Sequence, residues 1–193
     1  FLAPLKVGEA VTRTSQVASV TEKSGGSGKL VFVDVAHETH GPAGLAVREV
    51  QSLVYREPAA PGTPPAPPPL GEGRFDPTGW DQHRMIQPGA PLLFRFSALT
   101  FNSHRIHYDA PYAMGEEGYR GLVVHGPLTA TLLLDLAQRT LGDNALKAFA
   151  FRGMSPAVAD EALHLVMRGK GEAIELGAFA ADGRQVMSAS ATA

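Results

Sequence analysis

The sequence predicts an α+β protein in which an antiparallel sheet wraps around one long helix. Three strand-like runs precede residue 57, a leucine-rich helical segment covers 127–141, and four short strand-like runs follow it. Strands in direct succession pair as antiparallel neighbours, and a helix that is apolar on most sides is a buried one. We therefore expect two halves joined by a proline-rich segment, of which only the second contains its own helix.

The N-terminal half, residues 1–56, is interpreted as three long strands. β-branched residues are frequent in it, and Val31, Val33 and Val35 alternate along the second strand. The expected strands cover 10–20, 29–39 and 45–55. Three antiparallel strands without a helix cannot bury both faces of their sheet. We expect the second half or another copy of the chain to cover it, and a homodimer is the expected assembly.

A linker is expected over residues 57–91. Ten of the fifteen prolines lie in it, seven of them between Pro58 and Pro69. Such a run favours the extended polyproline II conformation and cannot donate hydrogen bonds to a sheet. The single tryptophan, Trp80, also lies here, so we expect the later part of the linker to pack on a surface. The linker is the predicted domain boundary.

The C-terminal half, residues 92–193, is expected to contain the buried helix, from Pro127 to Leu141. Proline suits the first helical position, and Gly142 suits the position just past the helix end. Before the helix, the apolar run Leu92–Leu99 is interpreted as a strand that enters the core.

Four further strands are expected after the helix, and Asp182-Gly183 indicates a hairpin turn before the last of them. They cover 145–154, 161–168, 172–180 and 185–191. One helix wrapped by an antiparallel sheet is the hot-dog arrangement. The chain is therefore predicted to be a double hot-dog whose N-terminal half is incomplete.

Composition excludes several classes of function. Apolar residues make up 44% of the chain, charged residues 19%, and the net charge is −2. No concentrated basic patch is apparent, so we expect no nucleic-acid partner. Without cysteine there is no disulfide and no thiolate metal site. No apolar run reaches about 18 residues and no signal peptide begins the chain, so we expect no membrane partner and a cytoplasmic location.

Candidate chemistry is concentrated just before the helix, where His104, His107 and His125 lie close to Gly126. Histidine is the side chain best suited to move protons near neutral pH. The first N–H groups of a helix have no internal partner, and a glycine lets a ligand oxygen approach them. An imidazole beside a helix N-terminus suits the carbonyl of a thioester. A metal pair of His104 and His107 with Asp109 is the alternative, but further ligand spacing is missing and we expect no metal.

Two segments carry a resemblance to a known family. The run SALTFNSHRIHYD, residues 97–109, and the run GLVVHGPL, residues 121–128, resemble the MaoC-like hot-dog hydratases and dehydratases. The nearest branch is that of the type 2 hydroxyacyl-thioester dehydratases, together with the bacterial 3-methylfumaryl-CoA and itaconyl-CoA hydratases. The resemblance implies a hydro-lyase that acts on a short-chain enoyl- or 3-hydroxyacyl-CoA, such as mesaconyl- or itaconyl-CoA. It implies no cofactor, because coenzyme A is part of the substrate.

The resemblance also implies roles for single residues. In the (R)-specific enoyl-CoA hydratases of this superfamily, an Asp and a His five residues later hold the catalytic water. The His corresponds to His107, but the Asp position is occupied by Asn102, and an amide cannot act as a general base. His107 is then expected to transfer the protons, with Asn102 orienting the water and the N–H of Gly126 binding the thioester carbonyl. Further substrate contacts are expected from His104, Arg105, Tyr108 and His125.

Other interpretations of these residues stay open. Asp109 also suits the N-cap of a short turn, and Gly126 also suits a simple helix start. A thioesterase of the same fold would use water and a helix N-terminus as well, but typically with a carboxylate base. A non-catalytic acyl-CoA-binding module is the third alternative, because the usual Asp is missing.

Overall fold

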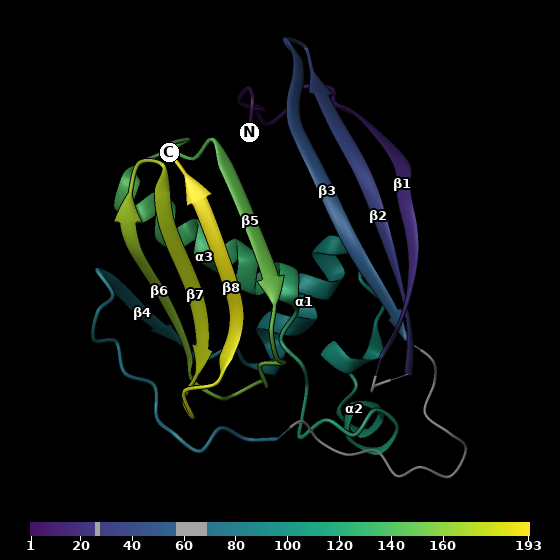
Figure 1. The fold of residues 1–193 in the computed structure, drawn as a ribbon, viewed down its shortest axis with the longest axis vertical. Coiled ribbons are helices and arrows are strands. Elements are labelled where there is room, and N and C mark those ends of the chain that lie inside the picture. Colours follow the sequence, from purple (N-terminus) through teal and green to yellow (C-terminus); the bar gives the residue numbers. More distant parts are fainter. Residues whose placement is uncertain (26–27, 57–68) are drawn as a thin grey trace. The chain divides into compact units, whose positions relative to one another are not determined.

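The computed structural model describes residues 1–25, 28–56 and 69–193. The chain divides into two compact units, Phe1–Thr63 and Pro64–Ala193. Figure 1 shows that the first contains strands, whereas the second contains a sheet and helices.

The first unit is a three-stranded antiparallel sheet in the order β1-β2-β3. Its strands are β1 (Thr12–Gly25), β2 (Gly28–Gly41) and β3 (Gly44–Arg56). All three predicted strands are therefore confirmed, and each is longer than expected. The register shifts once between β1 and β2, at Val17/Ser19, and once between β2 and β3, at Thr39/His40. No helix occurs among residues 1–25 and 28–56.

The second unit contains a five-stranded antiparallel sheet in the order β4-β6-β7-β8-β5 (Figure 1). Its strands are β4 (Gln82–Ile86), β5 (Ala148–Gly153), β6 (Leu163–Lys170), β7 (Ala173–Ala180) and β8 (Gln185–Thr192). The four strands predicted after the helix are confirmed. The predicted turn between β7 and β8 forms as well, with Gly183 at a φ of 81°.

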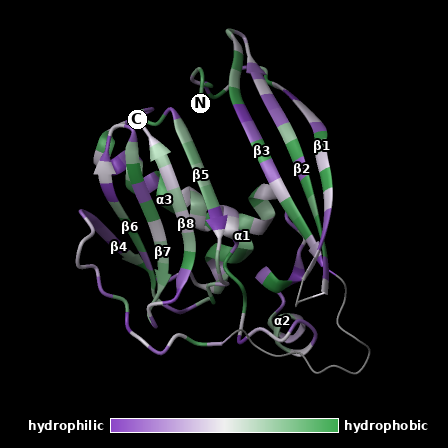
Figure 2. Cartoon of the chain, viewed as in Figure 1, coloured by the Kyte–Doolittle hydropathy of each residue, from purple (hydrophilic) through white to green (hydrophobic). Residues whose placement is uncertain are grey.

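The long helix α3 (Gly126–Leu141) packs on this sheet, against β6, β7 and β8. Leu133 of the helix is completely buried together with Leu163, Leu165 and Met187 of the strands. Figure 2 shows hydrophobic residues distributed along the helix and the strands of this unit. The predicted antiparallel sheet around one buried helix is therefore confirmed for the second unit.

Leu133→Ala is expected to lower the free energy of unfolding by about 2–5 kcal/mol. Removing a fully buried leucine side chain loses its transfer free energy and leaves a cavity. Urea denaturation followed by circular dichroism measures the change. Leu99→Ala is the matched control, because Leu99 is largely exposed and its truncation should change the free energy by less than about 0.5 kcal/mol. Equal losses in both variants would contradict the assigned core.

The predicted strand Leu92–Leu99 is wrong, because this segment lies in the helix α1 (Ala90–Thr100). Pro91 lies in the first turn of α1, where a missing N–H costs nothing. The buried side chains are those of Leu93 and Ser97, which are four residues apart and so share one helical face. Phe101 ends the helix in the left-handed conformation, with a φ of 53°.

The expected linker, 57–91, contains structure in its later part. Residues 57–68, with most of the prolines, lie outside the described residues. Gln82–Ile86 forms β4, which pairs with β6, so a strand lies inside the expected linker. Trp80 packs against Phe179 and lies under the guanidinium of Arg168, so this aromatic side chain does rest on the sheet.

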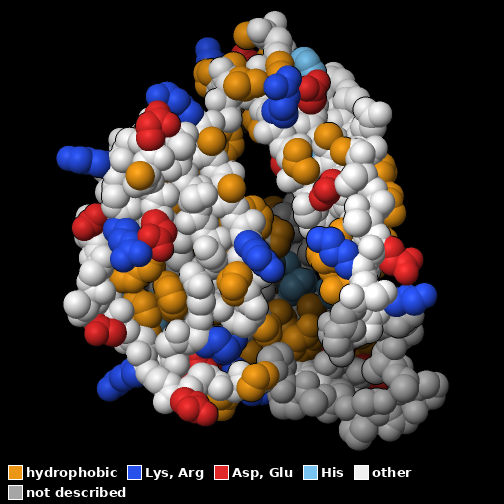
Figure 3. Space-filling model, viewed as in Figure 1, with side chains coloured by type: hydrophobic (Ala, Val, Ile, Leu, Met, Phe, Trp, Pro, Cys, Tyr) orange, Lys and Arg blue, Asp and Glu red, His pale blue; other side chains and the backbone are white. Residues whose placement is uncertain are grey.

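None of the helices in the described part of the chain has the length and apolarity that crossing a bilayer requires. In Figure 3 the Lys and Arg side chains are interspersed with Asp and Glu on the face in view.

Candidate functional site

His107 lies at the end of a short 3-10 helix, η1 (Arg105–His107), and only 7% of it is exposed. Its Nδ1 lies 2.7 Å from the carbonyl oxygen of Val123. A carbonyl can only accept, so Nδ1 carries the proton and Nε2 carries the lone pair when the ring is neutral. Burial lowers the pKa of His107, and the Val123 carbonyl only partly offsets this effect. The ring is therefore held as a neutral base with a fixed tautomer.

His125 is the N-cap residue of α3 and is completely buried. Its ring stacks on that of His107, with 3.6 Å between centroids and 19° between planes. Its Nε2 lies 2.8 Å from the hydroxyl of Ser97 on α1, whereas its Nδ1 has no hydrogen-bond partner among the described residues. Burial, and next the nearby His107, lower the pKa of His125 to about 4. This imidazole is neutral near pH 7.

The start of α3 is open. Gly126 is exposed, and a Cβ at this position would meet no heavy atom within 4 Å. Pro127 follows it and has no N–H, the side chain of His125 does not cap the helix, and the first turn contains no acidic residue. The positive end of the helix dipole is therefore not compensated by the helix's own side chains, which favours an electronegative ligand atom there.

The loop before η1 places Asn102 and His104 beside each other. The side-chain oxygen of Asn102 accepts a hydrogen bond from the backbone N–H of His104, at 2.9 Å. The ring of His104 is exposed and meets His107 edge-on, with 5.5 Å between centroids. Tyr108 donates its hydroxyl to the Ser103 carbonyl. The structure thus brings the three histidines together, while the amide of Asn102 turns back to its own loop.

Arg105 is paired with another residue of the motif. Its guanidinium lies 2.7 Å from the carboxylate of Asp109 and stacks on the ring of Tyr112, 4.0 Å from its centroid. Asp109 also caps α2 (Ala110–Gly115) by accepting from the Tyr112 N–H. The expected capping role of Asp109 is confirmed. Hydrogen bonds from Arg105 and from that N–H lower the pKa of Asp109.

A hollow of about 350 Å³ lies between the exposed face of α1 and the loop that follows it. Two predicted site residues, Asn102 and Tyr108, line it. The other lining residues were not among the predicted site residues and are Phe94, Ser97, Ala98, Phe101 and Ser103. Ser97 connects the hollow with the histidines, because its hydroxyl contacts His125. Neither His107 nor Gly126 is among the lining residues.

Two contributors to the site were missed from the sequence. Ser97 was missed because α1 was interpreted as a strand, in which Leu93 and Ser97 would not have stood out as a buried pair four residues apart. Val123 was missed because it acts through its backbone carbonyl, which no side-chain pattern reveals.

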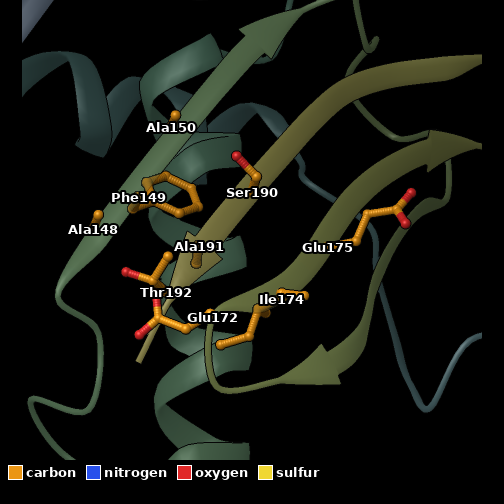
Figure 4. A pocket seen from close by; sticks show the side chains of 10 residues that line it. Ala148, Phe149, Ala150, Glu172, Ile174, Glu175, Ser190, Ala191 and Thr192 are labelled. Carbon is orange, nitrogen blue, oxygen red and sulfur yellow. The ribbon is translucent and has the colours of Figure 1, made fainter.

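A second hollow, of about 390 Å³, crosses β5, β7 and β8 (Figure 4). Its lining consists mainly of small and apolar side chains, and its two carboxylates belong to Glu172 and Glu175. Glu175 is paired with Arg168 at 2.7 Å. No histidine lines it, so it offers no partner for the chemistry of the α3 site. Within residues 1–25, 28–56 and 69–193, no three His, Asp or Glu side chains gather as a metal site.

The sequence model of the hydroxyacyl-thioester dehydratase type 2 family matches residues 1–159. The chain belongs to this family. A mesaconyl-C(4)-CoA hydratase from Chloroflexus aurantiacus is 44% identical over 189 residues, which cover 98% of this chain and 65% of that protein. The family resemblance stated from the motif is thereby confirmed.

The fold of this dehydratase-family chain is also similar to that of solved structures. The full-length peroxisomal multifunctional enzyme type 2 from Drosophila melanogaster aligns with a TM-score of 0.75 at 20% identity, over 99% of this chain and 35% of that one. A MaoC-like dehydratase aligns with a TM-score of 0.74 at 15% identity, over 98% and 71%. These similarities confirm the predicted fold class. The chain spans about two thirds of the length of its Chloroflexus relative.

The buried histidines of this family member predict a loss of stability in mild acid. The pKa of His125 is about 4 in the folded state and about 6.5 when unfolded, so the unfolded state binds more protons between these values. Stability should be complete above pH 6.5 and decline as the pH falls to about 4, by about 3 kcal/mol from His125. The pKa of His107 is also lowered and adds in the same direction.

Urea denaturation at several pH values between 7 and 4 measures this dependence. Carboxylates with a lowered pKa in the folded state, such as Asp109, add to the decline only below about pH 5. His125→Gln should give a shallower decline, because the group responsible has been removed. An equal slope in the variant and the wild type would contradict the assignment.

Proposed function

We propose that the chain catalyses reversible addition of water to an α,β-unsaturated acyl thioester of coenzyme A, with mesaconyl-CoA as the first candidate substrate. The observation that carries the proposal is the state of His107. Its Nδ1–H is bound to the Val123 carbonyl, and its Nε2 makes no hydrogen bond to any described residue. The name of the Chloroflexus relative supports the choice of substrate.

In the hydration direction, Nε2 of His107 takes a proton from water while the water oxygen bonds to the β-carbon. The electron pair of the double bond moves toward the thioester and gives an enolate, whose oxygen the N–H of Gly126 binds. The imidazolium of His107 then returns its proton to the α-carbon. One water is consumed, one C–O and one C–H bond form, and no cofactor is needed. A neutral, low-pKa imidazole suits the first step, because it is unprotonated at pH 7.

Asn102 is proposed to orient the water or the acyl group. Its oxygen is used by the His104 N–H, which leaves the two donors of its amide nitrogen for a ligand. Asn102 also lines the hollow of about 350 Å³, a size within the range of small-molecule sites. Because His107 and Gly126 do not line this hollow, we propose that it takes the part of the substrate beyond the reacting carbons, with Tyr108 as a further contact. His104 lies beside His107, and Arg105 lies beside Asp109. His104 and Arg105 are proposed as contacts for the coenzyme A moiety.

The thioesterase alternative has less support. It calls for a carboxylate base, and in the described part of the chain no carboxylate is hydrogen-bonded to His107 or His125. Asp109 is occupied by Arg105 and the α2 cap, and Glu117 accepts from the Tyr112 hydroxyl.

A panel of enoyl- and 3-hydroxyacyl-CoA thioesters, including mesaconyl- and itaconyl-CoA, tests the proposal. Hydration is followed by loss of the enoyl absorbance and by mass spectrometry of the product, and thiol release is followed separately. We expect a product heavier by one water and no free coenzyme A. Thiol release without hydration would favour the thioesterase, and binding without turnover of any member would favour a non-catalytic module.

The expected homodimer and cytoplasmic location belong to the proposal as well. Light scattering of the purified chain tests the first, and fractionation of the cells that produce it tests the second.

A further inference from the structure

Three side chains from three separate elements form a continuous buried array. Ser97 comes from α1, His125 from the start of α3, and His107 from η1. The Ser97 hydroxyl lies 2.8 Å from Nε2 of His125, and the His125 ring lies face to face with that of His107 at 3.6 Å. All three residues are at least nine-tenths buried. The array connects α1 with the proposed base.

Burying His125 lowers the stability of the fold, because one of its ring nitrogens has no hydrogen-bond partner among the described residues. One of its two ring nitrogens is bonded to Ser97, and the other has no partner among the described residues. A buried polar atom without a partner costs stability, whereas an apolar side chain of similar size would fill the same space without that cost. Phe96 is an apolar neighbour of the His125 ring, with 4.9 Å between the ring centroids, so the surroundings of His125 would accept an apolar side chain. Simple core filling therefore does not explain an imidazole here.

The stacked contact acts directly on His107. A ring at 3.6 Å and nearly parallel covers one face of His107, keeps water away from that face and fixes the plane of the ring. The other contacts of His107 are the Val123 carbonyl at Nδ1 and the edge of His104. Together they leave Nε2 as the free end of a ring whose rotation is restrained.

The charges around the stack favour a neutral His125. The titratable groups that act on it are His107 and His104, and both repel a proton on its ring. Among the described residues, His104 is the only titratable group that adds to burial in lowering the pKa of His107. His125 thus stays neutral while His107 gains and loses a proton.

We infer that His125, held by the hydroxyl of Ser97, is a positioning residue that fixes the orientation of His107 and shields it from water. The inference deepens the proposed function and rests on it, because it assigns His107 as the base whose geometry matters. His125 itself touches no reacting atom in this assignment.

Two variants test the two contacts of the array separately: the stack of His125 on His107 and the hydrogen bond between Ser97 and His125. His125→Gln removes the stacked ring but retains an amide that can reach the Ser97 hydroxyl. Ser97→Ala removes the hydroxyl but leaves the ring in place. Each is examined in two ways: by NMR titration of the His107 imidazole, which needs no substrate, and by the pH dependence of kcat/KM for hydration.

We expect the titration midpoint of His107 to rise toward about 6.5 in His125→Gln, because water reaches the uncovered ring. The acid limb of the kcat/KM profile should move to higher pH by the same amount, and kcat should fall by up to about 10²-fold, because a loosened ring misplaces the base. Ser97→Ala should shift both in the same direction by less. If His125→Gln fails to fold, the Ser97→Ala measurements decide.

An unchanged His107 midpoint in folded variants would overturn the inference, even if stability or activity fell, since a merely structural residue would give that result. A shifted midpoint in a protein that hydrates no thioester would retain the positioning of His107 and refute only the proposed function. The two failures are therefore distinguishable.

Discussion

His107→Asn is expected to lower kcat/KM for thioester hydration by at least about 10²-fold, the usual contribution of a general base. Asparagine can still donate a hydrogen bond to the Val123 carbonyl, which lies 2.7 Å from Nδ1, but it has no group that takes up a proton at neutral pH. The substitution therefore separates the chemistry of Nε2 from the packing of the loop. Initial rates of hydration measure the effect, and circular dichroism and urea denaturation verify the fold.

His83→Asn is the matched control, because His83 is an exposed residue of β4 whose ring contacts His164 of β6 and Phe75 of the segment before β4. Its rate should equal that of the wild type. A folded His107→Asn protein with nearly normal turnover would refute the assignment of the base. The same assay supplies a second check: because burial lowers the pKa of His107, the acid limb of the wild-type kcat/KM profile should have its midpoint below the ordinary histidine pKa of about 6.5.

The elements that could be predicted are those whose own residues carry start, stop or periodicity signals. Pro127 and Gly142 delimit α3, and leucines on most of its sides require a cover, so both the helix and its burial follow from sequence. Alternating valines identify β2 in the same way. Each of these signals lies within the element that it describes.

The element that could not be predicted is α1. Its apolar residues form a short run without a clear period, and such a run fits a strand as well as a helix. Pro91 alone pointed to a helix start, whereas the buried pair Leu93 and Ser97 becomes visible only once the partner elements are known. β4 was missed for a related reason, because its pairing with β6 joins residues about 80 positions apart.

The same difference between local signals and long-range contacts applies to the site. His107, His125 and Gly126 could be selected because imidazoles and a helix start are chemically distinctive. Their geometry could not be predicted, since it depends on the Val123 carbonyl and on the hydroxyl of Ser97. Asn102 illustrates the difference: the motif marks it as a catalytic position, but its oxygen is already occupied by its own loop.

Gly126→Ala is expected to lower kcat by about 10²-fold without loss of stability. Alanine is the better helix former, by up to about 1 kcal/mol within a helix, and Gly126 is the first residue of α3. The position has no positive φ, and a Cβ would meet no heavy atom within 4 Å. The free energy of unfolding should therefore stay constant or rise. The added methyl group would nevertheless occupy the space through which a thioester oxygen approaches the helix start, where the loss of one donor usually costs 10²–10³-fold, in round numbers.

Gly153→Ala, in β5, is the matched control, because its Cβ would also meet nothing within 4 Å and its backbone is likewise not left-handed. It should leave turnover unchanged. A more stable but nearly inactive Gly126→Ala protein would mean that the open space at the α3 start serves the ligand and not the fold, because an alanine that improves the helix can harm activity only through what approaches from outside. Full activity in that variant would instead remove the helix start from the mechanism and leave His107 without its proposed partner at the enolate oxygen.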